Sequence, residues 1–538
     1  MVGRLSGWLS SPWFLLALTA GLSAFVVQSG ELGSADTMHR LQTAHSFWTS
    51  EPAVFPEEYP EFGVHGRGGK LYDWYGIGQP LLMLPADVAG TYIERLPVFA
   101  AYNGNDPSVR NIVVSYSTNI LVSVLTALVC FRFLLGLGFS TRQAAGGVLA
   151  LLFSTSHLHY TQNMMENNYI LLLTLAGFTF GYDWLRSGSR RSLLIGSAAF
   201  GLNLLTRLTT GLDLLAGASF LFLVLYFEGV RGPALAQRAV EYAKTALPVY
   251  AVFVLIDRLY QYYRFGSFFN TYVHFFAAEH RRLDPSLPAS YPFETPFHRG
   301  FLGALFAPEK SIFLFDPLLL LTIAMAALAF RRLQPEIRAY LVAALLLLSA
   351  YISFYAKYTV WSGDFAWGDR YVSTAAELVG FISVPLLARH RIELGKLVST
   401  MGVGLIAVSA MIQLASLTFW LPLEIYQMET LGHPTFVIAL RFKNMLAFAL
   451  GKMQAWGLNN YAMTQDQWDY VHITTWNFLP FVLRRVGEAP GWVVKTSMSI
   501  WIAALAALAW ALWRLGEVSL ARESGRGDGS PVAATASR

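Results

Sequence analysis

The fold of this 538-residue chain is decided by "SPWFLLALTAGLSAFVV", residues 11–27, and by "GSADTMHRLQTAHSFW", residues 33–48. The first stretch is apolar and almost long enough to span a bilayer as a helix. The second leaves the membrane and carries Asp36, followed one helical turn later by Arg40. No convincing cleavage site follows the apolar run, so we predict an uncleaved first transmembrane helix.

The composition is that of a multi-pass membrane protein. Hydrophobic residues make up 54% of the chain and charged residues only 14%, whereas soluble domains carry about 25% charged residues. The net charge of +5 is modest and fits membrane orientation better than nucleic-acid binding. The single cysteine, Cys130, excludes intrachain disulfides. We therefore expect an integral protein of a bacterial inner (plasma) membrane, with no nucleic-acid partner.

Hydropathy predicts an all-α polytopic bundle of about 12 (11–13) transmembrane helices. The expected spans lie near 11–28, 110–136, 143–160, 166–184, 192–206, 210–228, 245–263, 311–330, 338–356, 371–388, 397–420 and 492–514. The stretch 78–101 is interrupted by prolines and charged residues, and we expect it to lie in the interface or re-enter the membrane. Counting it as a span would reverse the orientation of every later loop.

Loop charges predict the orientation. Four short connections carry three Lys or Arg each, which makes their side cytoplasmic, together with both termini; they are residues 186–191, 231–244, 331–338 and 388–396. The long loops 29–109, 264–310 and 421–491 then face outward. We expect a catalytic module over 1–396, C-terminal helices over 397–515 and a flexible cytoplasmic tail over 516–538.

Ionisable residues within the predicted helices gather in the outer halves. Such residues are costly in a membrane and often mark functional sites; here they are Arg207, Asp213, Asp257, Arg258, Asp316 and Glu377. The inner halves are almost wholly apolar. The pattern predicts a cavity open to the outside and to the outer leaflet, although any single pair could equally serve helix packing.

Three outer segments supply further candidate residues. "GRGGKLYDWYGIGQPLLMLP", residues 66–85, offers a loop at the membrane surface but no phosphate-binding Walker motif. "KYTVWSGDFAWGDRYVS", residues 357–373, alternates charges with aromatics, and "FFAAEHRRLDP", residues 275–285, holds adjacent arginines. The alternatives are an aromatic belt with snorkelling cations and contacts with lipid head groups. Asp36 could likewise only cap its helix or pair with Arg40.

The histidines His157 and His159 could bind a metal with Glu166, but two interfacial histidines without a further clear ligand favour a structural role. We predict no dedicated metal site, and a divalent-metal requirement stays open. The region 421–491 contains cations and histidines but no motif that names a role.

The order of these elements resembles the GT-C superfamily of polytopic glycosyltransferases. An acid just beyond the first helix is joined by "GKLYDWYGIGQPLLMLP", "FGSFFNTY", "GALFAPEKSIFLFDPLLLL" and "WSGDFAWGDRY". Together they are similar to the bacterial branch near the dolichyl-phosphate-mannose protein mannosyltransferases and the aminoarabinose transferases. The resemblance covers most of residues 1–390. Ala35 stands where relatives commonly have a second acid, and Asp73 where many have a cation.

The resemblance implies an inverting transfer of a sugar from a polyprenyl-phosphate donor to a glycan, lipid or protein acceptor on the extracytoplasmic face. Asp36 would be the catalytic residue. Cations would bind the donor phosphate, and the candidates are Arg370, Arg207, Lys70, Lys357, Arg281 and Arg282. Supporting roles are expected for Arg40, Asp369, Tyr75, Gln79 and His280. The alternatives are an O-antigen polymerase or ligase that uses residues 421–491, and a transporter or flippase of a lipid-linked sugar.

Overall fold

The computed structural model describes residues 10–100, 102, 107–460, 474–486 and 489–527. The helices are α2 (Pro12–Val27), α3 (Ala35–Ser46), α4 (Gly78–Glu94), α5 (Val109–Gly136), α6 (Thr141–Ser154), α7 (His157–Asn163), α8 (Asn167–Ser187), α9 (Arg190–Thr206), α10 (Gly211–Phe227), α11 (Gly232–Phe265), α12 (Tyr272–Leu283), α13 (Phe297–Phe306), α14 (Ile312–Phe315), α15 (Leu318–Ala329), α16 (Pro335–Tyr355), α17 (Ser373–Gly380), α18 (Ser383–Ser416), α19 (Pro422–Glu429), α20 (Val437–Ala449), α22 (Leu479–Val486) and α23 (Gly491–Gly527). Two short strands, β1 (Val64–His65) and β2 (Leu71–Tyr72), pair antiparallel in the first outer loop.

Within the described residues, six helical segments are long and apolar enough to cross a membrane. They are Val109–Gly136, Leu208–Phe227, Gly232–Phe265, Pro335–Tyr355, Ser373–Ser416 and Gly491–Ser519. The helix α2 is apolar but shorter. These segments mark an integral membrane protein with an α-helical fold. The larger number of about 12 spans stays a prediction.

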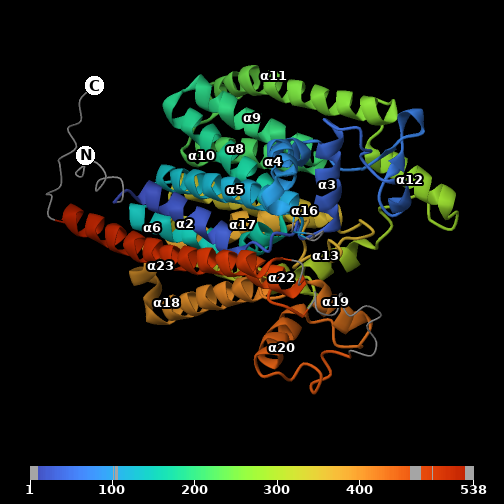
Figure 1. Cartoon of the computed structure of the whole chain (residues 1–538). Helices are drawn as coiled ribbons and strands as arrows, with labels where there is room; N and C mark the ends of the chain where they lie inside the picture. Colours follow the sequence, from blue (N-terminus) through green and yellow to red (C-terminus); the bar gives the residue numbers. More distant parts are fainter. Residues whose placement is uncertain (1–9, 101, 103–106, 461–473, 487–488, 528–538) are drawn as a thin grey trace.

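The long helices lie side by side, and the smaller outer elements gather at one end of them (Figure 1). We call this end, which carries α3, α12, α13 and α19, the outer end of the bundle. The start of α2 and the end of α23 both lie at the opposite end (Figure 1). The helix α3 runs across the bundle direction, as expected of a helix lying along a membrane surface.

The doubtful stretch, one predicted connection and the predicted tail compare differently with the structure. Within 78–101, residues Gly78–Glu94 form one helix, α4, which packs against α3 and α5 and contains Pro85; its interfacial or re-entrant position stays a prediction. The predicted connection 388–396 is confirmed, because the range α18 consists of two helices that meet at a break at Gly395 (φ 77°, ψ 172°). A glycine adopts this left-handed φ without the clash that a Cβ would cause. The predicted tail from 516 is helical through Gly527, because α23 continues to that residue.

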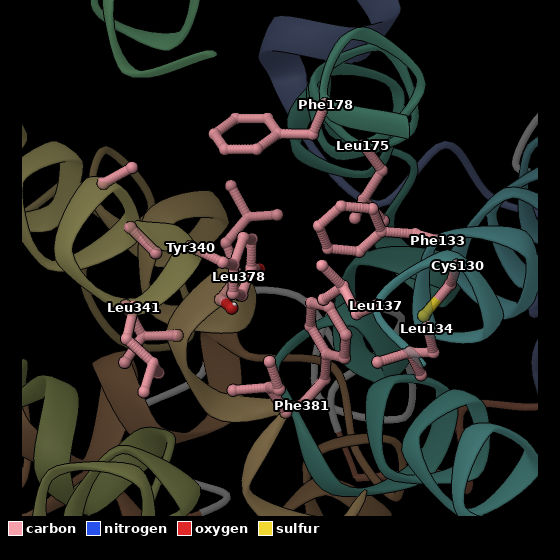
Figure 2. Close-up of a cluster of buried hydrophobic side chains, with 14 of the residues drawn as sticks. Cys130, Phe133, Leu134, Leu137, Leu175, Phe178, Tyr340, Leu341, Leu378 and Phe381 are labelled. Carbon is pink, nitrogen blue, oxygen red and sulfur yellow. Dashed lines mark hydrogen bonds between the residues drawn. The ribbon is translucent and has the colours of Figure 1, made fainter. Parts of the chain in front are cut away.

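The bundle interior away from the outer end is filled by apolar side chains (Figure 2). Phe133 of α5 meets Tyr340 of α16 with ring centroids 5.0 Å apart. The Tyr340 hydroxyl donates a hydrogen bond to the carbonyl oxygen of Leu378 at 2.6 Å, so its only polar group is satisfied. Phe178 and Phe381 complete the cluster.

The first outer loop is fixed to the bundle by a buried arginine. Arg264, near the end of α11, is 1% exposed and pairs with the Asp73 carboxylate at 2.9 Å. Its guanidinium also donates to the carbonyl oxygens of Asp73 at 2.7 Å and Tyr75 at 3.0 Å. Three bonds to one guanidinium hold the chain around Tyr75 in place, and this side chain is therefore presented in a defined position.

Candidate functional site

A cavity of about 780 Å³ lies at the outer end of the bundle. Its wall comes from α3, the chain around Tyr75, the start of α8, the segment between α9 and α10, α11, α12, the loop before α17, and α19. The ionisable side chains in the lining are Asp36, Arg40, Glu61, Tyr75, Glu166, Arg207, Asp257, Tyr272, His280, Tyr355, Tyr358, Asp364, Arg370 and Tyr371, together with the buried His159. Of the six ionisable residues predicted in the outer halves of the helices, Arg207 and Asp257 line this cavity. The other four do not belong to its lining, so the prediction of one shared cavity holds only in part.

Asp36 lies in the first turn of α3, where a helix N-terminus favours an acidic side chain. Ser34, not Asp36, caps the helix by accepting a hydrogen bond from the Thr37 amide. The carboxylate of Asp36 is therefore free to make other contacts. One of its oxygens accepts a hydrogen bond from the Tyr75 hydroxyl at 2.6 Å, and the other is ion-paired with Arg370.

The prediction that Asp36 and Arg40 form an ion pair along their helix is wrong. The guanidinium of Arg40 instead pairs with Glu166 at 2.7 Å and lies 4.1 Å from the ring centroid of Tyr75. Spacing of four residues permits a pair on a helix surface, but a buried carboxylate from α8 competes for this cation. Arg40 still favours the ionised form of Asp36 through its charge.

The electrostatics keep Asp36 ionised. Burial raises the pKa of Asp36, but the charges of Arg370 and Arg40 and the hydrogen bond from Tyr75 outweigh burial and hold this pKa well below its usual range. Burial and the Asp36 carboxylate raise the pKa of Tyr75 well above its usual value. The phenol therefore stays protonated and serves as a hydrogen-bond donor to Asp36.

Glu166 is the residue of this site whose role sequence reasoning missed. Its two carboxylate oxygens pair with Arg40 and Arg207, while Asp36 takes Arg370. Three guanidiniums therefore share two carboxylates, and this cluster carries a net positive charge. Such a cluster attracts an anion, and arginine is suited to bidentate binding of phosphate oxygens. The sequence suggests Glu166 only as a metal ligand beside His157 and His159.

Two arginines of the cluster rest on one aromatic ring. The guanidinium carbons of Arg207 and Arg370 lie 5.3 and 5.2 Å from the ring centroid of Tyr371. Tyr371 itself stacks on Tyr355 of α16 at 4.3 Å with an interplanar angle of 9°. Stacked rings hold both cations in place without neutralising them. The Tyr355 hydroxyl is hydrogen-bonded to Thr209 at 2.9 Å.

The cavity lining also contains apolar side chains. They include Leu204, Leu208 and Phe354, and Leu208 and Phe354 are 36% and 44% exposed. Asp257, a further lining residue, is paired with its neighbour Arg258. The lining therefore combines apolar side chains with the charged cluster.

The remaining predicted cations do not join the cluster. Lys70 and Lys357 are exposed and lie outside the cavity lining. Arg281 donates to the carbonyl oxygen of Ala289, and Arg282 contacts Glu279 at 3.5 Å. Because these four side chains point to solvent or to outer loops, the structure separates them from Asp36.

The predicted supporting residues have mixed positions. His280 lines the cavity and stacks near Phe276, with ring centroids 4.0 Å apart. The Gln79 amide donates to the carbonyl oxygen of Met164 at 3.0 Å, which joins α4 to the chain before α8. Asp369 is 4% exposed and lies behind the cavity wall.

A divalent cation does not fit the carboxylates of this cluster. Among the described residues, no three His, Cys, Asp or Glu side chains come together as ligands. Asp36 and Glu166 are already occupied by guanidiniums. His157 and His159 are buried in α7, so the structural interpretation of these histidines fits their positions.

No protein-family model and no curated protein matches the chain. Among solved structures, it is similar to ArnT from Cupriavidus metallidurans bound to undecaprenyl phosphate, with 14% identity, a TM-score of 0.43, and coverage of 96% of this chain and 78% of that one. It is also similar to the Archaeoglobus fulgidus oligosaccharyltransferase tethered with an acceptor peptide, with 14% identity, a TM-score of 0.42, and coverage of 86% and 60%. Both similarities are at low sequence identity, and both TM-scores lie below 0.5.

Proposed function

We propose that this chain is an inverting glycosyltransferase that moves a sugar from a polyprenyl-phosphate donor to an acceptor at the outer face of the membrane. The observation that carries the proposal is the pairing of Asp36 with Arg370 inside a cavity lined by both charged and apolar side chains. The ion pair provides a base for the acceptor and a cation for the donor phosphate at one point. The apolar lining residues would contact the lipid chain.

Asp36 acts as the general base in this proposal. An acceptor hydroxyl attacks the anomeric carbon of the donor sugar, and its proton passes to the Asp36 carboxylate. The bond from that carbon to the phosphate oxygen breaks, and its electron pair leaves with the phosphate. One displacement inverts the configuration at the anomeric carbon. A positioned base contributes about 10²–10⁴-fold to such a step.

Arg370 and Arg207 receive the phosphate. The leaving phosphate gains negative charge as the bond breaks, and cations placed beforehand stabilise that charge in the transition state. When phosphate oxygens bind Arg370, they take part of the positive charge that Asp36 now neutralises. The pKa of Asp36 then rises towards its usual range, which makes this carboxylate a stronger base once the donor is bound.

The apolar packing around Phe133, Tyr340 and Phe381 supports an enzyme rather than a carrier. A carrier with alternating access needs a polar path to both membrane faces, whereas the side chains packed around these rings are apolar. An enzyme that relies on the cations of the last outer loop finds less support, because Arg441 is fully buried and paired with Glu424 at 2.6 Å. His472, one of the histidines of this loop, lies outside the described residues.

Reconstituted protein tests the proposal. Proteoliposomes with a panel of labelled polyprenyl-phosphate sugars are incubated with candidate acceptors, and wild type is compared with Asp36→Asn and Arg370→Ala. We expect transfer by wild type with inversion and severe loss in both variants. Asp284→Asn is the matched control, because Asp284 is exposed beyond α12 and outside the cavity. Transfer at the wild-type rate by Asp36→Asn would overturn the proposal.

A further inference from the structure

Arg370 is carried by a loop whose backbone cannot belong to a helix or a strand. We call residues 363–370 the Arg370 loop. Gly363, Asp364 and Gly368 have φ angles of 76°, 58° and 69°, in the left-handed region that interrupts regular structure. A non-glycine residue such as Asp364 rarely adopts this conformation, so other contacts must hold the loop.

Those contacts come from side chains of other elements. The Lys310 ammonium donates to the carbonyl oxygens of Asp364, Ala366 and Gly368 at 2.5, 2.9 and 3.2 Å. The Tyr160 hydroxyl donates to the carbonyl oxygen of Trp367 at 3.0 Å, and the Asn167 amide to that of Arg370 at 2.6 Å. Five of the eight carbonyl groups in the Arg370 loop thus accept hydrogen bonds from three side chains.

Lys310 donates three of these five hydrogen bonds. An ammonium has three N–H donors and no acceptor, and here each carbonyl oxygen accounts for one donor. The side chain is 7% exposed and lies just before α14, behind the cavity wall that the loop forms. A buried ammonium without such acceptors would be strongly disfavoured. The charge and the loop conformation therefore depend on each other.

The loop in turn fixes Arg370. A Cβ added at Gly363 would lie 2.6 Å from Cγ and 2.9 Å from the backbone nitrogen of Arg370, so the two ends of the loop are in close contact. Trp367 is buried against Phe315, with ring centroids 5.0 Å apart, and anchors the middle of the loop. A change in the loop backbone would therefore displace the guanidinium that faces Asp36.

We propose that Lys310 is a positioning residue for sugar transfer: its ammonium shapes the Arg370 loop through three main-chain carbonyl oxygens and thereby holds Arg370 opposite Asp36. This inference rests on the proposed function for its consequence in catalysis. Its structural part concerns the loop alone and is measurable without transfer. Lys310 does not line the cavity, so it acts through the loop and not on the substrate.

Two variants separate the ammonium from the space it fills. Lys310→Met keeps a long side chain but removes all three donors, and Lys310→Ala leaves room for an added ethylammonium ion. Hydrogen–deuterium exchange of peptides over 360–372 reports the loop directly. In Lys310→Met we expect exchange there to become about tenfold faster or more, and transfer to fall by a similar factor in kcat.

Rescue by ethylammonium shows specifically whether the ammonium group of Lys310 is what shapes the Arg370 loop. We expect it to restore both slow exchange and transfer in Lys310→Ala, with no effect on Lys310→Met or on Arg370→Ala, in which the reacting cation itself is missing. Lys310→Arg is the second variant and keeps a buried cation; its planar guanidinium cannot meet all three oxygens at once, so we expect exchange between those of wild type and Lys310→Met.

The outcomes are distinct. Wild-type exchange over 360–372 in Lys310→Met overturns the proposal, as does a loss of transfer that neither changes exchange nor responds to ethylammonium in Lys310→Ala. If wild type transfers no sugar from any donor, the proposed function fails, while faster loop exchange in Lys310→Met and its reversal by ethylammonium in Lys310→Ala still decide whether Lys310 shapes the loop.

Discussion

The guanidinium of Arg370 is ion-paired with the carboxylate of Asp36, although 334 positions separate the two residues in the chain. Their side chains are only 12% and 18% exposed, so each depends on the other for its charge partner. A phosphate that binds Arg370 competes with this pair. In the proposed mechanism, the ion pair therefore links arrival of the donor to the basicity of Asp36.

Tyr75→Phe removes the one phenolic hydrogen bond to Asp36 and leaves the ring beneath Arg40. A hydrogen bond to a charged group contributes about 1.5–3 kcal/mol, and loss of orientation of the base affects the chemical step. We expect kcat to fall about tenfold or more, with KM for the donor little changed. Steady-state kinetics with the accepted donor measure both constants. A rise in KM with an unchanged kcat would contradict this role for Tyr75.

Glu166→Gln leaves Arg40 and Arg207 without their shared carboxylate. Breaking a buried ion pair by removing one partner costs about 3–5 kcal/mol, so the unfolding temperature should drop clearly. An anion can replace the missing carboxylate, and undecaprenyl phosphate should therefore raise the unfolding temperature more in this variant than in wild type. Glu57→Gln, at an exposed position, is the control. An equal effect of the lipid on both proteins would count against a phosphate site at these arginines.

Gly363→Ala tests the close packing of the Arg370 loop. The added Cβ meets Arg370 at 2.6 Å, and the φ of 76° disfavours any residue with a side chain. We expect transfer to fall about tenfold or more while the overall fold persists, because the strain of about 1–3 kcal/mol is confined to the loop. Gly404→Ala in α18 meets no neighbouring atom and should keep full transfer. Full transfer by Gly363→Ala would show that the site tolerates a displaced loop.

The pH dependence should report Lys310. Burial lowers the pKa of Lys310 to about 8, even though the Asp369, Asp364 and Glu309 charges oppose the effect of burial and only Arg370 adds to it. Above this pH the ammonium loses a donor and its charge, and the Arg370 loop loosens. We expect transfer to fall above about pH 8 in wild type and to fall later in Lys310→Arg, since a guanidinium stays charged. If transfer by wild type and by Lys310→Arg fell at the same alkaline pH, Lys310 would not be the group whose deprotonation limits transfer.

The contribution of Lys310 to stability should rise with pH, whereas transfer falls. The unfolded chain binds the Lys310 proton up to about pH 10.5, whereas the folded chain releases it from about pH 8. Between these values the unfolded state binds more protons, so the free energy of unfolding contributed by this group rises with pH. The difference in unfolding temperature between wild type and Lys310→Arg from pH 7 to 10 measures this contribution. A decrease across that window would contradict the lowered pKa.

The α-helical membrane fold and the helix that carries Asp36 were predictable, because long apolar runs and the residues that follow them depend on local sequence. The pairing within the cluster was only partly predictable. Resemblance indicated Asp36 and Arg370, but spacing assigned Arg40 to Asp36, since a neighbour one turn away is visible in sequence and Glu166 of a distant segment is not.

Lys310 was beyond sequence reasoning for a related reason. Its partners are main-chain carbonyl oxygens of Asp364, Ala366 and Gly368, which every sequence offers and no motif marks. Lys70 shows the reverse case. It lies in a glycine-rich loop that suggested phosphate binding, yet the side chain is exposed on a turn away from the cavity. Contacts that depend on backbone geometry appear only when the chain is folded.

The central claim is that Asp36 is the base for transfer, and single-turnover kinetics of Asp36→Asn test it most directly. Proteoliposomes carrying the labelled donor that wild type accepts are mixed with acceptor, and undecaprenyl-phosphate binding is measured on the same preparation. We predict transfer slower by about 100-fold or more, with lipid binding equal to or tighter than that of wild type because Arg370 is released. Transfer by Asp36→Asn at the wild-type rate, with normal lipid binding, would contradict the account.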